Sequence, residues 1–170
     1  CTAVPASMVQ AAAKYHVGII TGTVNQGEDE VRGAEAMIKE YGDVKNGGMI
    51  QHLTYPNNFA AEQETTISQI VSLANDPLMK AIVMNQAVPG ATEGFRRVRE
   101  MRPDILLLGG VPQEDPLVIG KVADLTMRND FISAGYRVIW ASKQLGAKTF
   151  VHISFPRHMS YETLGRRRAI

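Results

Sequence analysis

The stretch IITGTVNQGEDE, residues 19–30, runs an apolar segment into a turn whose residues could hold a ligand. Gly22 and Gly27 have the glycine spacing of a phosphate-binding P-loop, but Glu28 and Asp29 stand where that loop has lysine and a hydroxyl residue. Two carboxylates there would repel phosphate, whereas in the first turn of a helix the helix dipole stabilises them. The glycines also do not form the G-x-G-x-x-G pattern of dinucleotide-binding turns. The turn is therefore predicted to bind a polar group of a ligand through the free N–H groups at the start of the helix, without the lysine and hydroxyl residue that bind phosphate in a P-loop.

Five short apolar runs, each flanked by glycine, proline or asparagine, are the elements that would position such a turn. The first four lie roughly 25 to 33 residues apart, which is the length of a strand-plus-helix unit. Between them, apolar residues follow helical spacing, as in the stripe Val31, Ala34, Ile38 and Tyr41. The predicted fold class is α/β, with a parallel sheet flanked by helices on both faces. The predicted strands are 16–22, 49–55, 80–86, 104–110 and 149–155.

The segments that follow these strands form the candidate site, because open parallel sheets bind ligands beyond the carboxyl ends of their strands. These segments are rich in Thr, Asn, Gln, Tyr and Pro, and they contain almost no pair suited to acid–base or nucleophilic chemistry. Such residues suit hydrogen bonding to a neutral or zwitterionic small molecule, although Asn and Pro also serve as ordinary turn formers. The segments are 21–26, 55–58, 85–90, 109–113 and 155–158.

Composition and spacing argue against several functional classes. Eighteen basic and 17 acidic residues give a net charge of +1, so the overall charge favours neither nucleic acid nor an anionic membrane as a partner. The basic run at 166–168 is interpreted as a solvated helix face. The four histidines lack the close spacing of metal ligands, so neither a metal site nor a cofactor is predicted. No G-x-S-x-G elbow or activated nucleophile is evident, and the chain is not expected to be an enzyme.

Cys1, the single cysteine, stands before a small and weakly patterned stretch, residues 1–15, which is interpreted as a tether. One hypothesis makes Cys1 the lipid-carrying first residue of a mature bacterial lipoprotein. The alternatives are an arbitrary chain boundary or a buried cysteine. No apolar run approaches the roughly 18 to 20 residues needed to span a bilayer.

The spacing of the elements changes after the fourth strand. Residues 16–127 are predicted to form a first α/β lobe, and residues 128–170 a crossing and an incomplete second lobe. The linker-like passage from one lobe to the other is expected around residues 122–129. A long helix is expected between 131 and 145, with Asn129 or Asp130 capping its start and Gly146 closing it. One helix and one strand cannot build a core alone, so the 170 residues are expected to be a fragment.

The order of elements, and above all the segment DLTMRNDFISAGYRVIWASKQLGAKTFVHIS (124–154), resembles the type I periplasmic binding proteins. The closer likeness is to poorly characterised bacterial solute-binding lipoproteins, related in fold to the basic membrane lipoproteins. In such proteins the ligand lies between two lobes and contacts the turns after the strands. Tyr55 and Phe155 are the evident candidates for stacking on a ligand. The resemblance implies these ligand contacts: Thr21, Gly22, Thr23, Gln26, Tyr55, Asn57, Asn85, Gln86, Gly110, Gln113, Asn129, Asp130, Arg157 and His158.

This resemblance leads to a functional expectation. The chain is expected to be the extracytoplasmic solute-binding lipoprotein of an ABC-type importer, anchored through Cys1 and docking on a membrane permease. Its ligand would be a nucleoside, an amino acid, a sugar-like molecule or another small polar metabolite. The main alternative is the ligand-sensing effector core of a transcription regulator or sensor with the same fold. An enzyme on a related α/β fold is a third hypothesis.

Overall fold

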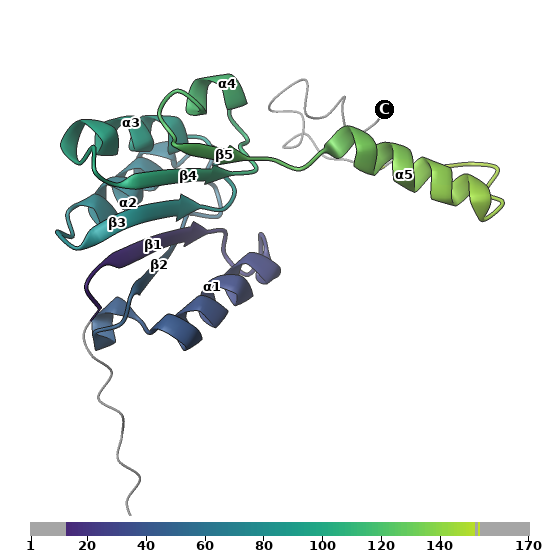
Figure 1. Cartoon of the computed structure of the whole chain (residues 1–170). Helices are drawn as coiled ribbons and strands as arrows, with labels where there is room; N and C mark the ends of the chain where they lie inside the picture. Colours follow the sequence, from purple (N-terminus) through teal and green to yellow (C-terminus); the bar gives the residue numbers. More distant parts are fainter. Residues whose placement is uncertain (1–12, 152, 154–170) are drawn as a thin grey trace, which may run out of the picture.

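The protein is described by a computed structural model that covers residues 13–151 and 153. Five strands alternate with helices along the chain (Figure 1). The strands are β1 (His16–Thr21), β2 (Ile50–Thr54), β3 (Met79–Met84), β4 (Leu106–Gly110) and β5 (Leu125–Met127). The α-helices are α1 (Glu28–Tyr41), α2 (Gln63–Ala74), α3 (Ala91–Met101), α4 (Pro116–Ile119) and α5 (Phe131–Gln144), and a 3-10 helix, η1, covers Val44–Asn46.

All five strands pair in parallel, in the order β2-β1-β3-β4-β5, so the predicted α/β class and parallel sheet are confirmed. Strand order reverses between β1 and β3. With right-handed crossovers, this reversal places α1 on one face of the sheet and α2, α3 and α4 on the other (Figure 1). The carboxyl ends of β1 and β3 therefore lie side by side, with helices leaving toward opposite faces.

The hydrophobic core lies between the sheet and the helices α2 and α3. Ile82 and Met84 of β3 and Leu107 of β4 are fully buried there, against Leu73 of α2 and Phe95 of α3. Close packing leaves no room for side chains at some positions, since a Cβ on Gly18 would lie 2.7 Å from Leu73 Cδ1. The core fixes the sheet in place beneath the strand ends.

The opposite face of the sheet is covered only in part. Helix α1 packs over β1 and β2 through its buried residues Val31 and Ala34. Over β4 and β5, Leu106, Leu125 and Met127 are each 48% exposed. Parallel sheets are usually covered on both faces, and among the described residues no element covers this apolar region.

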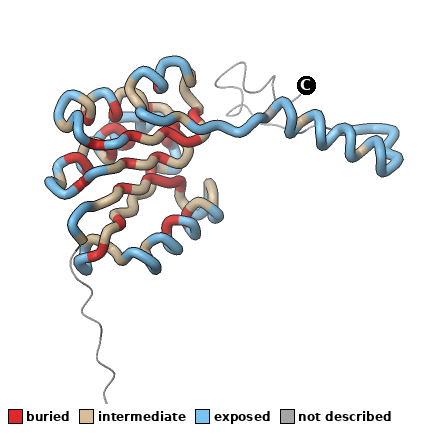
Figure 2. The backbone as a smooth tube through the Cα atoms, viewed as in Figure 1, coloured by how far each residue is buried: buried red, intermediate tan, exposed pale blue. Residues whose placement is uncertain are grey.

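Helix α5 projects away from the sheet and is exposed along nearly all of its length (Figures 1 and 2). Its exposed side chains are largely apolar and include Ile132, Tyr136, Val138, Ile139 and Trp140. Asp130 caps its first turn by accepting a hydrogen bond from the backbone N–H of Ser133 at 3.1 Å, as one of the two predicted capping residues. A helix with so little polar surface normally packs against other protein.

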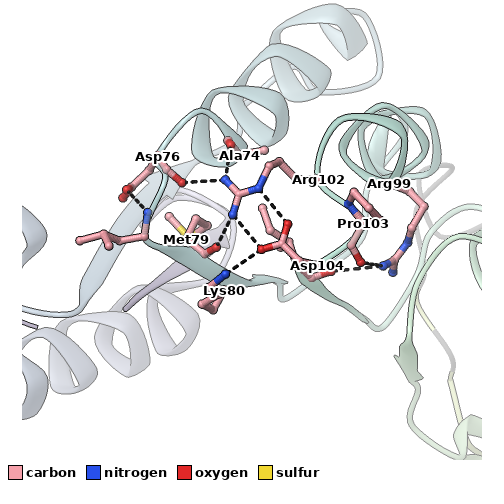
Figure 3. Close-up of polar contacts among 10 residues, drawn as sticks. Ala74, Asp76, Met79, Lys80, Arg99, Arg102, Pro103 and Asp104 are labelled. Carbon is pink, nitrogen blue, oxygen red and sulfur yellow. Dashed lines mark hydrogen bonds and ion pairs between the residues drawn. The ribbon is translucent and has the colours of Figure 1, made fainter. Parts of the chain in front are cut away.

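The amino-terminal edge of the sheet is held by Arg102, which follows α3 (Figure 3). Its guanidinium donates to the carbonyl oxygens of Ala74 (3.2 Å), Asp76 (3.1 Å) and Met79 (3.2 Å). It also pairs with Asp104, and this pairing, with help from Lys80, holds the pKa of the Asp104 carboxyl well below its usual range. One side chain thus joins the end of α2, the start of β3 and the segment before β4.

Two sequence-based expectations about secondary structure were wrong. Residues 122–129 were interpreted as a crossing, but β5 lies within them and pairs with β4. The short helix α4 was also not anticipated. The expected strand at 149–155 does not form within residues 149–151 and 153, and the rest of that segment lies outside the described residues. A strand requires a neighbouring strand, and none pairs with this segment among the residues described.

Candidate functional site

The ends of β1, β3 and β4 bring three of the predicted contact residues together. The backbone N–H of Asn85 donates to the carbonyl of Ile20 at 2.9 Å, which holds the end of β3 against β1. A Cβ on Gly110 would lie 3.2 Å from Asn85 Oδ1, so the end of β4 passes close to the same amide. Thr21, Asn85 and Gly110 therefore lie along one edge, as the parallel arrangement predicted.

A second group joins the loops that follow β1 and β2. Thr23 Oγ1 donates to Asn57 Oδ1 at 2.5 Å, and Gln26 Nε2 donates to the carbonyl oxygen of Asn57 at 2.9 Å. Gln26 Oε1 also accepts from the backbone N–H of Thr23 at 3.3 Å. These hydrogen bonds hold the two loops together. The side chains of Thr23, Gln26 and Asn57 therefore use most of their hydrogen-bonding groups within this cluster.

Tyr55 does not present a stacking surface at this edge. Its side chain is 1% exposed and its ring meets Phe59 edge to face, with ring centroids 5.6 Å apart and an interplanar angle of 87°. Its hydroxyl lies beside the turn after β1, since a Cβ on Gly22 would be 2.9 Å from Tyr55 Oη. The expectation of a stacking platform is corrected on this point: Tyr55 packs in the core, and a side chain at residue 22 would require its hydroxyl to shift.

A chain of side-chain hydrogen bonds runs along the edge from β4 to α1. Gln113 Nε2 donates to Gln86 Oε1 at 2.9 Å, and Gln86 Nε2 donates to Glu30 Oε1 at 2.5 Å. The other oxygen of Glu30 faces the backbone N–H of Gly22 at 3.4 Å. The predicted residues Gln86 and Gln113 are thus joined, through an acid that the sequence interpretation did not select, to the turn after β1.

An open cavity of about 280 Å³ lies between α1 and the strands β1 and β3. Its polar lining comes from Thr21, Asn85, Asp29 and Glu30. Apolar side chains of the sheet and of α1 complete it. The lining residues are Ile19, Thr21, Asp29, Glu30, Gly33, Ala34, Met37, Val83 and Asn85.

The sequence offered one signal for the role of Glu30. Glu30, Gly33, Ala34 and Met37 follow the i, i+3, i+4, i+7 spacing of a single helix face. That face points toward the sheet, because Ala34 is buried. The sequence interpretation assigned Glu28 and Asp29 to the helix dipole and did not consider Glu30. In the structure Glu28 pairs with Arg32 on the outer surface.

His52, on β2, forms a side-chain hydrogen bond with Thr21 at the end of β1. The hydroxyl of Thr21 donates to the carbonyl of Gly22 at 2.8 Å, so His52 Nε2, at 2.8 Å from Thr21 Oγ1, donates to that oxygen. Burial lowers the pKa of His52, and the Glu35 carboxylate offsets this only in part. The neutral ring is therefore the form that the folded protein favours.

Replacing His52 is expected to flatten the dependence of stability on pH. The unfolded His52 has a pKa of about 6.5. Because the folded pKa is lower, the unfolded state takes up the proton first as pH falls, so stability is lost from about pH 6.5 downward. The variant His52→Gln keeps an amide N–H for Thr21 and removes this loss. Urea unfolding of both proteins at pH 7.5 and 5.5 measures the change in the free energy of unfolding with pH. The same change in His52→Gln as in the natural protein would contradict the conclusion that His52 is neutral in the folded state.

The remaining predicted contacts do not join this cluster in the described residues. Asn129 and Asp130 follow β5, and Asp130 is used as the helix cap of α5. Arg157, His158, Phe155 and Cys1 lie outside the described residues. Within residues 13–151 and 153, no three His, Cys, Asp or Glu side chains are grouped as metal ligands would be. No helix in this part of the chain has the length and apolar character needed to cross a membrane.

The fold and this edge define an open, parallel α/β domain with a cavity at its strand-order reversal, lined by apolar side chains and a few polar ones. Residues 15–170 match the family described as "Protein of unknown function (DUF3798)", and the chain belongs to that family. Two Treponema pallidum (strain Nichols) proteins, both described as uncharacterized, are similar to it. One is 40% identical over 163 residues, covering 95% of this chain and 74% of its own length. The other is 44% identical over 101 residues, covering 59% of this chain and 47% of its own length.

A solved structure from Clostridium difficile 630, described as a "Putative transcriptional regulator", has a similar fold. The TM-score is 0.73 at 24% identity, and the match covers 92% of this chain and 46% of that one. The chain thus spans about half the length of that solved protein. At this identity the likeness shows a shared fold.

Proposed function

We propose that this protein is an extracytoplasmic solute-binding lipoprotein of an ABC-type importer, with the fold of the type I periplasmic binding proteins. The observation that carries the proposal is the cavity between α1 and the ends of β1 and β3, whose lining residue Glu30 is joined by hydrogen bonds to Gln86 after β3 and, through it, to Gln113 after β4. Concave sites with a few convergent polar groups are typical small-molecule sites, and open parallel sheets place them at this position. The lipid on Cys1 and the membrane permease are parts of the same proposal.

Helix α5 supports the proposal that a second lobe takes part in binding. Its exposed apolar surface requires a protein partner, and it follows the edge strand β5 directly at the carboxyl edge of the sheet. A lobe built on α5 would close over the cavity, and trapping the solute would stabilise the closed form that a permease recognises.

Native mass spectrometry of the purified protein tests this function. We expect a retained small molecule that is released on gentle denaturation. Gln86→Ala breaks the hydrogen-bond chain from Gln113 to Glu30 and should reduce the retained fraction. Gln63→Ala is the matched control, because Gln63 is exposed and lies outside the cavity lining. An empty protein that also shows no thermal shift with a metabolite library would count against the proposal.

A second candidate function is the effector core of a transcription regulator, favoured by the fold likeness to the Clostridium difficile protein. Cell fractionation separates the two. A lipoprotein partitions with membranes and is digested by protease added outside the cytoplasmic membrane, whereas a regulator stays protected in the cytoplasm.

A further inference from the structure

The cavity beside α1 holds carboxylates that have no cationic partner. Glu28, on the same helix, pairs with Arg32. Within the described residues, Asp29 and Glu30 form no ion pair, and no lysine or arginine lines the cavity. The recorded partners of Glu30 are neutral donors, Gln86 Nε2 and the backbone N–H of Gly22. The cavity therefore carries uncompensated negative charge, which attracts cations and repels anions.

The hydrogen-bond chain fixes Glu30 as an acceptor. Gln113 donates to Gln86, and Gln86 donates to Glu30, so both amides are oriented with their N–H groups toward the acid. A carboxylate has about four acceptor positions on its two oxygens, and these two recorded contacts leave some of them available. Because Glu30 lines the cavity, a ligand that reaches it gains most by donating a hydrogen bond.

The rest of the cavity is suited to hydrocarbon. Ile19 and Val83 are aligned partners on neighbouring strands and form the floor. Ala34 and Met37 of α1 form the wall above them. A volume of about 280 Å³ is at the low end for small-molecule sites. The shape and lining fit a short apolar body with one charged end.

We infer that this cavity binds a small organic cation, a protonated amine on a short apolar body, and that Glu30 is the acceptor that determines this specificity. The inference rests on the proposed function, that this edge of the sheet binds a solute. It replaces the neutral or zwitterionic ligand expected from the sequence with a cation, and it excludes inorganic phosphate and simple carboxylates.

Isothermal titration calorimetry of the 170-residue protein at low ionic strength tests the inference. The probes are n-butylamine and n-pentylamine, each a protonated amine at one end of a short hydrocarbon chain, set against pentanoate and inorganic phosphate. We expect the amines to bind and the anions not to bind. Glu30→Gln keeps an oxygen that accepts from Gln86 but loses the charge, and it should weaken amine binding by about 10- to 100-fold. Glu40→Gln makes the same charge change on α1 outside the cavity lining and should bind as the natural protein does.

The outcomes separate this inference from the proposed function. Binding of pentanoate or phosphate, or equal amine affinity in Glu30→Gln and Glu40→Gln, would overturn the cation inference. Failure of both amines, with a neutral solute retained in native mass spectrometry, would overturn the inference and leave solute binding standing. If neither amine binds and the purified protein retains no solute, both the cation inference and the proposed solute-binding function would be overturned. Circular dichroism of each variant confirms that it is folded before titration.

Discussion

Gly48→Ala should lower the free energy of unfolding by about 3 kcal/mol or more. A Cβ at residue 48 would lie 2.2 Å from the carbonyl carbon of Gly42 and 2.4 Å from its Cα. Backbone atoms cannot turn aside as a side chain can. The Gly42 carbonyl is also fixed, since it accepts from Met49 N (3.0 Å) and Ile50 N (2.9 Å) at the start of β2. Relieving the clash therefore requires breaking the entry to a sheet strand.

The neighbouring Gly47 supplies the control. It has φ +80°, and a Cβ there would meet no atom within 4 Å. Gly47→Ala should cost about 1 kcal/mol, the usual cost of placing a side chain in the left-handed region. Urea unfolding of both variants measures the difference. Equal losses for the two alanines would mean that the loop relaxes freely and that the contact with Gly42 does not matter.

Much of the sheet could be predicted because its residues follow simple periods. Runs such as Ile105 to Leu108 are apolar on both faces, which is typical of a covered parallel strand. The stripe Val31, Ala34 and Ile38 then identifies the helix that crosses between strands. These patterns fix which turns meet at one edge, and so the proximity of Thr21, Asn85 and Gly110 followed from the fold class.

Strand β5 could not be predicted in this way. It has only three residues, and no apolar run marks it. Its place depends on tertiary contacts: Asp124 Oδ2 accepts from Leu107 N at 2.8 Å and from Arg99 Nη2 at 2.6 Å. The strand predicted at 149–155 does not form within residues 149–151 and 153 for a related reason, because an apolar run forms a strand only beside another strand.

The role of Glu30 was missed for a different reason. The helix dipole explains an acid in the first turn of a helix whichever way its side chain faces. It therefore gives no information about whether the side chain faces solvent or the sheet. Only the rotation of α1 over β1 decides that Glu28 faces solvent while Glu30 faces Gln86. The edge of the sheet that carries the candidate site was thus predictable from topology, and its charge was not.

Arg102→Met should lower the melting temperature by about 5–10 °C, the second large effect expected of this fold. Methionine retains much of the apolar stem but removes the donors for the carbonyls of Ala74, Asp76 and Met79 (Figure 3). The Arg102 side chain is 23% exposed, so water replaces these donors only in part. Asp104 also loses one of the two cations that lower its pKa.

Arg32→Met is the matched control, because Arg32 is 69% exposed and its recorded partner is Glu28, one turn away on α1. Exposed pairs of this kind contribute little, so the melting temperature should change by no more than about 2 °C. Thermal unfolding at pH 7.5, in low salt and in about 0.5 M salt, compares the variants. Screening should weaken the exposed Arg32 pair and leave most of the Arg102 effect, since its three backbone carbonyls bear no net charge. If Arg102→Met and Arg32→Met shift the melting temperature equally, Arg102 does not hold α2, β3 and the start of β4 together.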